Sequence, residues 1–305
     1  MNRFPKVAII LLSYNKLSDT IECLKSLKRI TYPNYELFLV DNCSNEDVIK
    51  NIKQKYSNFY DNLIEIAPKN LGFTGGNNFV LDELKNRKDI DFFLLLSNDT
   101  VVEPEFLTEL VKTALWDERI AIVGSVIVDY YTKEIIFTNG KIDKKLKFEY
   151  KLDYLNPSKD WWETDVICGC AILLRRELFL KHSLFLDENL FLYCEEIDLC
   201  SRAKKSGLKI AVAGKSKVYH KEGQTTGGAS NPINVYYDVR NRILLARKLL
   251  PLRQRIIFWF LFIPARIVRN FEWLFKGKWK LIKANYFAFS DGIRGIKGKT
   301  KRKLS

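Results

Sequence analysis

The sequence lacks a stretch of roughly 20 apolar residues, which a membrane-spanning helix would need. Its one glycine-rich segment, at 72–76, matches neither the P-loop nor the dinucleotide-binding pattern. Only two histidines occur, and the six cysteines show no repeated metal-ligand spacing. These absences argue against a transmembrane protein, a P-loop nucleotidase, a dinucleotide-dependent oxidoreductase and a zinc-finger module. We expect the cysteines to be buried reduced thiols, as in a cytoplasmic protein.

The N-terminus has no recognisable targeting segment. The apolar run that follows Arg3 and Lys6 is too short for the hydrophobic core of a signal peptide and has no small-residue cleavage site. It consists of strand-forming residues, so we interpret it as the first strand of a sheet.

Charge is distributed unevenly along the 305 residues. From Arg240 to the end there are 18 basic and 2 acidic residues, a balance of +16, whereas the first 239 residues have a balance of −2. The body is therefore electrically ordinary, and the tail predicts contact with a polyanionic surface.

Apolar runs alternate with segments of helical periodicity. This alternation predicts an α/β fold with a mostly parallel central sheet flanked by helices. The expected strands are 7–13, 35–40, 63–67, 91–96 and 120–128, and the expected helices are 17–27, 46–56, 77–88 and 104–116.

Polar residues follow four of these strands, at 13–15, 41–44, 70–78 and 98–99. Ligands bind at the carboxyl edge of open α/β sheets, so we expect these loops to form one site. The glycines of 72–76 could present N–H groups to a phosphate, or form a plain turn. Asp41 could bind a base or ribose, and Asp99 a divalent ion, although each could instead cap a turn.

An acidic cluster at 187–198 is embedded among apolar residues. Carboxyl groups beside apolar side chains are held in position and can have shifted proton affinities, which suits a general base. On a helix Glu195 and Glu196 would point in different directions, so we expect one of them to face the reaction centre. Asp198 and Arg202 share a helix face and could form an ordinary surface ion pair. Gly207 follows as a helix stop.

In this order, the motifs resemble family 2 inverting glycosyltransferases of the GT-A fold, in the bacterial rhamnosyltransferase-like branch. The resemblance runs from about residue 7 to 245. The residues that carry it are Ser13-Tyr-Asn15, 40–44, 70–78, 96–100, 169–175, 191–202, His220 and 236–241.

The resemblance implies functions for several of these motifs. It implies a GT-A domain at 1–245 and catalysis by Glu196, with Glu195 and Asp198 as further candidates. It also implies Mg²⁺ or Mn²⁺ on Asp99 and His220, and an acceptor beside Gly169, Cys170 and Ala171. The implied donor-binding residues are Ser13, Asn15, Asp41, Asn42, Gly72, Gly75, Gly76, Asn77, Asn78, Asn98 and Asp99.

This chain departs from the family pattern at two places. Ser97 stands where a first metal-binding acid is expected, and the acidic pair is Glu195-Glu196 instead of Glu-Asp. Two other functions therefore stay open: a nucleotide- or carbohydrate-binding protein without activity, and a nucleotidyltransferase. The implied donor is dTDP-rhamnose or a UDP-sugar, and the implied acceptor is a glycan or a polyprenyl-linked glycan.

The tail, 246–305, mixes aromatic and aliphatic residues with Lys and Arg. This composition is typical of amphipathic helices that lie in a membrane surface. We expect a peripheral location on the inner face of the cytoplasmic membrane. A helix that packs on the body or forms an oligomer is the alternative, and no nucleic-acid-binding module is recognisable.

Overall fold

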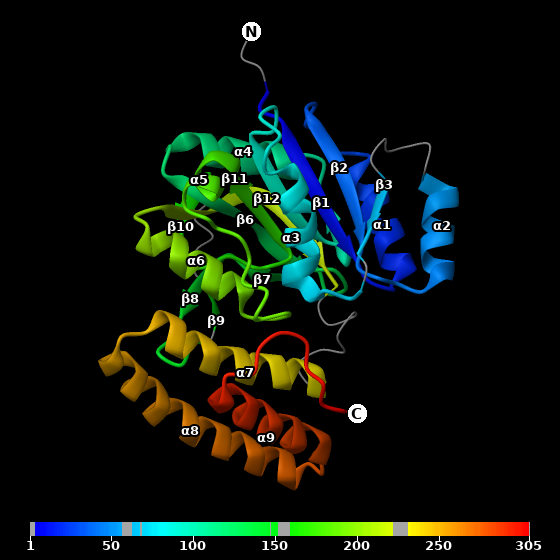
Figure 1. Cartoon of the computed structure of the whole chain (residues 1–305). Helices are drawn as coiled ribbons and strands as arrows, with labels where there is room; N and C mark the ends of the chain where they lie inside the picture. The colour runs from blue at the N-terminus through cyan, green and yellow to red at the C-terminus, as the bar shows by residue number, and fades with distance from the viewer. Residues whose placement is uncertain are drawn as a thin grey trace.

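The computed structural model describes residues 4–56, 63–67, 69–146, 148–151, 159–221 and 231–304. Its centre is one large sheet flanked by helices (Figure 1). The main strands are β1 (Val7–Ser13), β2 (Tyr35–Asp41), β3 (Leu63–Ile66), β4 (Phe92–Ser97), β6 (Ile120–Asp129), β10 (Trp161–Glu163), β11 (Ala171–Arg175) and β12 (Lys209–His220). The strands β5 (Thr100–Val102) and β7 (Ile135–Phe137) pair with β12 and β6, and β8 (Asn139–Ile142) pairs with β9 (Phe148–Lys151).

The strand order is β10-β12-β6-β11-β4-β1-β2-β3. The pairs β1–β2, β1–β4, β2–β3 and β6–β12 are parallel, whereas β11 runs antiparallel between β4 and β6. Strand β1 is buried along its whole length, because a central parallel strand is covered on both faces. The predicted α/β fold with a central sheet flanked by helices is therefore confirmed. The sheet is mixed, because β10 and β5 also pair antiparallel with β12, and β7 with β6.

Nine helices lie in the described residues. Those of the body are α1 (Leu17–Leu27), α2 (Glu46–Tyr56), α3 (Gly72–Leu84), α4 (Phe106–Trp116), α5 (Arg176–Lys181) and α6 (Glu195–Lys205). Helix α6 ends where predicted, and Gly207 adopts a φ of 75° just beyond it. The last three are α7 (Pro232–Leu249), α8 (Leu252–Phe275) and α9 (Trp279–Arg294).

The C-terminal helices form a layer below the sheet in Figure 1. Helix α9 packs along α7, and α8 contacts both of them. Helix α7 runs through residue 245, so the proposed division into 1–245 and 246–305 would fall inside it and stays a prediction. In the part of the chain that the structure describes, no helix is both long and apolar enough to cross a bilayer.

Two local predictions were wrong. The segment 72–76 is not a turn before a helix, because α3 itself begins at Gly72. The sequence predicts a strand at 209–213 and a short turn before His220, whereas β12 continues to His220 with a register shift between Ala213 and Lys217. Five of the six cysteines are buried, as predicted, and Cys43 is exposed.

Candidate active site

Sheet topology brings the predicted site residues to one edge. Ser13 is paired in register with Asp41 at the ends of β1 and β2, and His220 is paired with Thr100. Strand β11 is antiparallel, so its first residue, Ala171, lies at this same edge opposite Leu96. The segment that precedes Ala171 thereby reaches the carboxyl ends of the parallel strands, where α/β proteins bind ligands.

The acidic pair at the start of α6 faces this segment. A Cβ placed on Gly169 would lie 3.7 Å from Oε1 of Glu195 and 4.0 Å from Oε2 of Glu196. The prediction that the two side chains diverge is therefore wrong. Each has two methylene groups, which let both carboxyl groups bend toward one point from successive helix positions.

Both carboxyl groups hold protons more tightly than usual. Burial, aided by the Cys168 thiol, raises the pKa of Glu195 to about 7. Burial and then the charge of Glu195 raise the pKa of Glu196 well above its usual value. Oε2 of Glu195 is buried and has no hydrogen-bond partner within the described residues. The pair can therefore accept or share a proton near neutral pH.

Asp198 lies in a different environment. It is fully buried, and its two oxygens lie 2.8 Å from Nε of Arg202 and 2.7 Å from Nζ of Lys248. The Asp198–Arg202 pair is thus buried on one side, unlike the surface pair considered from the sequence. Both oxygens of Asp198 are engaged by cations of the chain itself, which argues against Asp198 as the group that meets an acceptor hydroxyl.

The loop before α6 has a strained backbone. Phe191, Tyr193 and Cys194 have φ values of 66°, 67° and 67°, a region that non-glycine residues rarely adopt. Nδ2 of Asn241 donates to the carbonyl oxygens of Leu190, Leu192 and Tyr193 at 3.0, 2.8 and 2.8 Å. Asn241 therefore fixes the loop from which the acidic pair projects.

Arg240 supports the same loop from α7. Its guanidinium is fully buried and donates to the carbonyl oxygen of Leu190 at 2.9 Å and to Oδ1 of Asn241 at 2.8 Å. Burial lowers the pKa of Arg240. Neither Arg240 nor Asn241 is assigned a role by the sequence alone, although both belong to the 236–241 motif.

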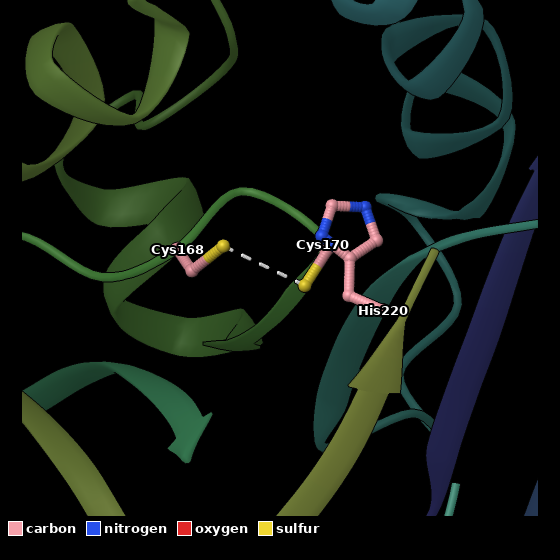
Figure 2. A group of neighbouring side chains, drawn as sticks. All are labelled: Cys168, Cys170 and His220. Atoms are coloured by element: carbon pink, nitrogen blue, oxygen red, sulfur yellow. Dashed lines mark hydrogen bonds between the residues drawn. The ribbon is translucent and has the colours of Figure 1, made fainter. Parts of the chain in front are cut away.

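Asp99 and His220 form the candidate metal centre. Oδ1 of Asp99 lies 3.4 Å from Nε2 of His220, and both side chains are largely buried. A carboxylate and an imidazole that converge at the ligand-binding edge suit a hard divalent ion that completes its shell with water and phosphate oxygens. The residues present therefore fit the Mg²⁺ or Mn²⁺ that the sequence predicts. His220 also lies close to the thiols of Cys168 and Cys170 (Figure 2).

The first and fourth strand-end loops are joined through Thr20. Its hydroxyl lies 2.9 Å from Oγ of Ser13 and accepts from Nδ2 of Asn98 at 2.9 Å. Asn15 is held by Ser44, whose hydroxyl accepts from its backbone N–H at 2.7 Å. Sequence reasoning missed Thr20, which carries no motif signal.

Asp41 retains one oxygen for a ligand. Its Oδ2 accepts from the backbone N–H of Ser44 at 2.8 Å, which is the capping role considered from the sequence. Its Oδ1 is buried and has no partner in the part of the chain described. A buried carboxylate oxygen without a donor is costly, so it predicts an incoming N–H or O–H group such as a base or ribose supplies.

The glycine-rich segment does not present free N–H groups. The N–H groups of Leu71 and Gly72 donate to Asn42 and Asn70, and those of Phe73 and Thr74 donate to the carbonyl oxygen of Phe191. These four N–H groups are therefore not available to a phosphate, because the chain itself satisfies them. A donor-binding role of the glycines stays a prediction.

The asparagine side chains of this region bind backbone groups of the surrounding loops and of α3. Nδ2 of Asn42 donates to the Gly72 carbonyl oxygen at 3.0 Å. Asn78 exchanges hydrogen bonds with the Leu186 backbone and donates to Glu188 at 3.1 Å. Asn77 donates to the Phe73 carbonyl oxygen at 2.8 Å, and its own Oδ1 is buried without a partner among the described residues.

The glycines permit close packing. A Cβ on Gly75 would lie 2.9 Å from Cβ of Leu71, and one on Gly76 would lie 2.6 Å from Cδ1 of Leu12 in β1. These distances leave no room for a side chain. Gly76 thus lets α3 pack against β1, whereas Gly75 packs against Leu71 at the start of the helix.

Gly72→Ala is expected to destabilise the protein strongly. Gly72 has a φ of 74°, and a Cβ there would lie 2.6 Å from Cδ2 of Phe191 and closer still to its carbonyl oxygen. Gly207 is a matched control, since its φ is 75° and no atom lies within 4 Å of its Cβ position. Both substitutions carry the left-handed backbone penalty of about 1–2 kcal/mol. Urea unfolding should show that Gly72→Ala lowers the free energy of unfolding by at least ~2 kcal/mol more than Gly207→Ala does. Equal losses in the two variants would contradict the packing of Gly72 against Phe191.

The chain is similar in sequence to known glycosyltransferases. The family model described as glycosyl transferase family 2 matches residues 8–182. Hyaluronan synthase from Streptococcus pyogenes is 32% identical over 110 residues, which are 35% of this chain and 26% of that protein. The chain thus spans about a quarter of the curated relatives that it matches.

Solved structures share the fold at low identity. GalNAc-T7 with UDP, GalNAc and Mn²⁺ has a TM-score of 0.62 at 15% identity, over 79% of this chain and 48% of that one. S. aureus TarS 1-349 in complex with UDP has a TM-score of 0.56 at 18% identity, over 83% of this chain and 70% of that one. The Pyrobaculum calidifontis mannosyltransferase PcManGT in complex with GDP-Man and Mn²⁺ has a TM-score of 0.58 at 13% identity, over 96% of this chain and 74% of that one. These likenesses show a GT-A-like fold.

Proposed function

Because this chain belongs to glycosyl transferase family 2, we propose that it transfers a sugar from a nucleotide-diphosphate sugar to an acceptor hydroxyl, with inversion. One observation carries the proposal: Glu195 and Glu196 converge on Gly169 at the ligand-binding edge of the sheet, and both have raised pKa values. A protein that only bound nucleotides would have no need for a costly buried acidic pair.

The donor is assigned to the side of the edge formed by β1, β2 and β4. The orphan oxygen of Asp41 would accept a hydrogen bond from the base or ribose. Asp99 and His220 would hold Mg²⁺ or Mn²⁺, which when bound neutralises charge on a leaving diphosphate. The S. aureus and GalNAc-T7 structures carry UDP, which favours a UDP-sugar; dTDP-rhamnose is the second candidate.

The acceptor is assigned to the surface around Gly169, next to Cys170 and Ala171. Glu196 is partly exposed and Glu195 is 6% exposed, so Glu196 is the member of the pair that an acceptor can reach. Glu196 would take the proton from the attacking hydroxyl as that oxygen bonds to the anomeric carbon and the diphosphate leaves. Glu195 would set the proton affinity of Glu196 through its charge.

A donor screen tests the function. The full chain with Mn²⁺ or Mg²⁺ receives a panel of UDP-, dTDP- and GDP-sugars, and release of nucleoside diphosphate is measured with glycan and lipid-linked acceptors. Release from one donor, abolished by EDTA, is the expected result. Binding of a nucleotide diphosphate without turnover on any donor and acceptor pair would favour the inactive binding protein instead.

We further propose that α8 lies on an anionic membrane surface and brings the enzyme to a polyprenyl-linked acceptor. Only Phe258 and Phe262 of this helix are buried. Exposed basic side chains accompany the apolar ones, among them Arg253, Arg269 and Lys276. The exposed large apolar residues of α8 are Leu252, Ile256, Ile257, Phe260, Leu261, Ile263, Ile267, Val268, Phe271, Leu274 and Phe275.

Basic charge is what selects a membrane over a second copy of the chain as the occupant of this face. Two copies would bring like charges together, whereas anionic lipid adds about 1 kcal/mol per nearby Lys or Arg. The apolar side chains would then enter the headgroup boundary. A location on the inner face of the cytoplasmic membrane follows from the same argument.

Vesicle flotation is expected to recover the chain with anionic vesicles and less with neutral ones. Phe260→Glu should weaken binding about tenfold or more, because burying one Phe contributes roughly 1.5–3 kcal/mol. Trp116→Glu is the matched control, since Trp116 is 71% exposed, close to the 80% of Phe260, but belongs to α4. Equal binding by both variants, or a stable dimer that fails to bind vesicles, would overturn the membrane proposal.

A further inference from the structure

We propose that Cys168, Cys170 and His220 form a binding site for a thiophilic metal ion such as Zn²⁺, and that its occupation withdraws His220 from the catalytic metal. The existence of the zinc site is argued from the positions of the three side chains alone. The competition between zinc and the catalytic metal for His220 rests on the proposed function.

The three ligand atoms are already close together. The two sulfurs are 3.6 Å apart, and all three ligand atoms lie within 4.8 Å of one another. In a tetrahedral zinc site with bonds of about 2.3 Å, two sulfur ligands are about 3.8 Å apart. The cysteine pair therefore has nearly the spacing that zinc requires, and a small movement of the His220 ring would complete three ligands.

The orientation of His220 suits this role. Its Nε2 lies against the Asp99 carboxylate, and in Figure 2 the other ring nitrogen, Nδ1, lies on the side of Cys170. In metal sites the second nitrogen of a ligating histidine usually donates to a carboxylate, which fixes the ring and its tautomer. Asp99 would serve as that carboxylate when Nδ1 binds zinc.

The donor set decides which metal binds. Two thiolates and an imidazole favour Zn²⁺, whereas Mg²⁺ and Mn²⁺ favour carboxylate, carbonyl and water oxygens. The thiophilic site and the Asp99–His220 centre therefore select different ions. The site offers three protein ligands in the described chain, which leaves one position for water or another ligand.

The two metals exclude each other at His220. A neutral imidazole has a single nitrogen lone pair, because the other nitrogen carries a proton. A ring bound to zinc through Nδ1 cannot also bind Mn²⁺ through Nε2. Zinc at the thiolates would thus remove one of the two protein ligands from the candidate catalytic centre and weaken Mn²⁺ binding.

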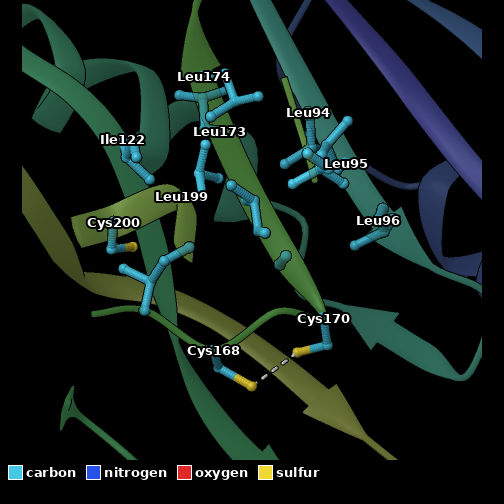
Figure 3. Packing of buried hydrophobic residues seen from close by; sticks show 14 of the residues in the cluster. Leu94, Leu95, Leu96, Ile122, Cys168, Cys170, Leu173, Leu174, Leu199 and Cys200 are labelled. Carbon is cyan, nitrogen blue, oxygen red and sulfur yellow. Dashed lines mark hydrogen bonds between the residues drawn. The ribbon is translucent and has the colours of Figure 1, made fainter. Parts of the chain in front are cut away.

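The fold holds the site in place. Cys168 and Cys170 are 9% and 4% exposed, at the margin of the buried cluster that includes β4 and β11 (Figure 3). The carbonyl group of Cys170 accepts from the N–H of Ser97 at 2.9 Å, which ties it to the end of β4. Gly169 stands between the two cysteines and against Glu195 and Glu196, so zinc here would also fix the segment beside the acidic pair.

Cobalt titration tests the site without any turnover. The reduced full chain is titrated with Co²⁺, whose bonds to thiolates give intense near-ultraviolet charge-transfer absorption. We expect one equivalent to bind with this absorption and to be displaced by Zn²⁺. Cys168→Ser and Cys170→Ser should each weaken metal binding roughly 100-fold or more, since loss of even a second-shell partner costs 10–100-fold. Cys43→Ser, at the exposed cysteine, is the control and should behave as wild type.

Paramagnetic resonance of Mn²⁺ tests the competition. Free Mn²⁺ is measured with the wild-type chain, with and without one equivalent of Zn²⁺, and zinc should release bound Mn²⁺ from the wild type but not from folded Cys168→Ser. Absence of charge-transfer absorption, or its survival in both serine variants, would overturn the site. Zinc binding with unchanged Mn²⁺ affinity would overturn the competition alone. A failed donor screen with intact cobalt binding would reject the transferase function and keep the site.

Discussion

Glu196→Gln is expected to lower the rate of sugar transfer by about 10²–10⁴-fold, the usual contribution of a general base. Donor binding should stay close to wild type, because the substitution keeps the size of the side chain and leaves Asp41 and Asp99 unchanged. Single-turnover transfer and calorimetric binding of the nucleotide diphosphate separate these effects. Glu177→Gln, at an acid on α5 outside the site, is the control.

The pH dependence of transfer should identify the same base. A base works only when deprotonated, and burial together with Glu195 raises the pKa of Glu196, so the rate should rise with pH on the acidic side. Glu195→Gln removes a neighbouring negative charge, which should lower the pKa of Glu196 and move this acidic limb to lower pH. Near-normal turnover in Glu196→Gln, or a limb that does not move in Glu195→Gln, would reject the assignment.

Asp99→Asn is expected to weaken Mn²⁺ binding about 100-fold or more, because it replaces a charged ligand by a neutral one in a centre with two protein ligands. Metal-dependent binding of the donor should fall in parallel. Donor binding without metal should change little, since Asp41 and the strand ends stay intact. Mn²⁺ titration by paramagnetic resonance gives the direct readout.

Asp160→Asn is a suitable control for this change. Asp160 is exposed, is paired only with Lys215 among the ion pairs described, and directly precedes β10, the outermost strand of the sheet. A metal titration in which Asp99→Asn and Asp160→Asn both match the wild type would show that Asp99 is not a ligand. His220→Ala would then remain as the test of the histidine.

The sequence by itself determined the alternation of strands and helices. Continuous apolar runs such as 7–13 can be satisfied only by burial on both faces, which a parallel sheet covered by helices provides. The helix stop at Gly207 was equally local, because a left-handed residue there needs glycine. The same logic placed polar residues at the ends of strands, and so at one edge of the sheet.

The tertiary structure decided how those residues act. Periodicity could not show that β11 runs antiparallel between β4 and β6, yet this reversal brings Gly169 to the acidic pair. Nor could it show that the N–H groups of Phe73 and Thr74 donate to the carbonyl oxygen of Phe191, a residue more than 100 positions away. Such pairings depend on long-range packing, to which a local pattern carries no signal.

The acidic segment shows both sides of this division. Composition predicted carboxyl groups with shifted proton affinity at 187–198, because apolar neighbours exclude water from them. Only the folded chain separates Asp198, held by Lys248 from α7, from Glu195 and Glu196, which face Gly169. Residue type sets which chemistry is available, whereas the partners that folding supplies set which of three similar acids can perform it.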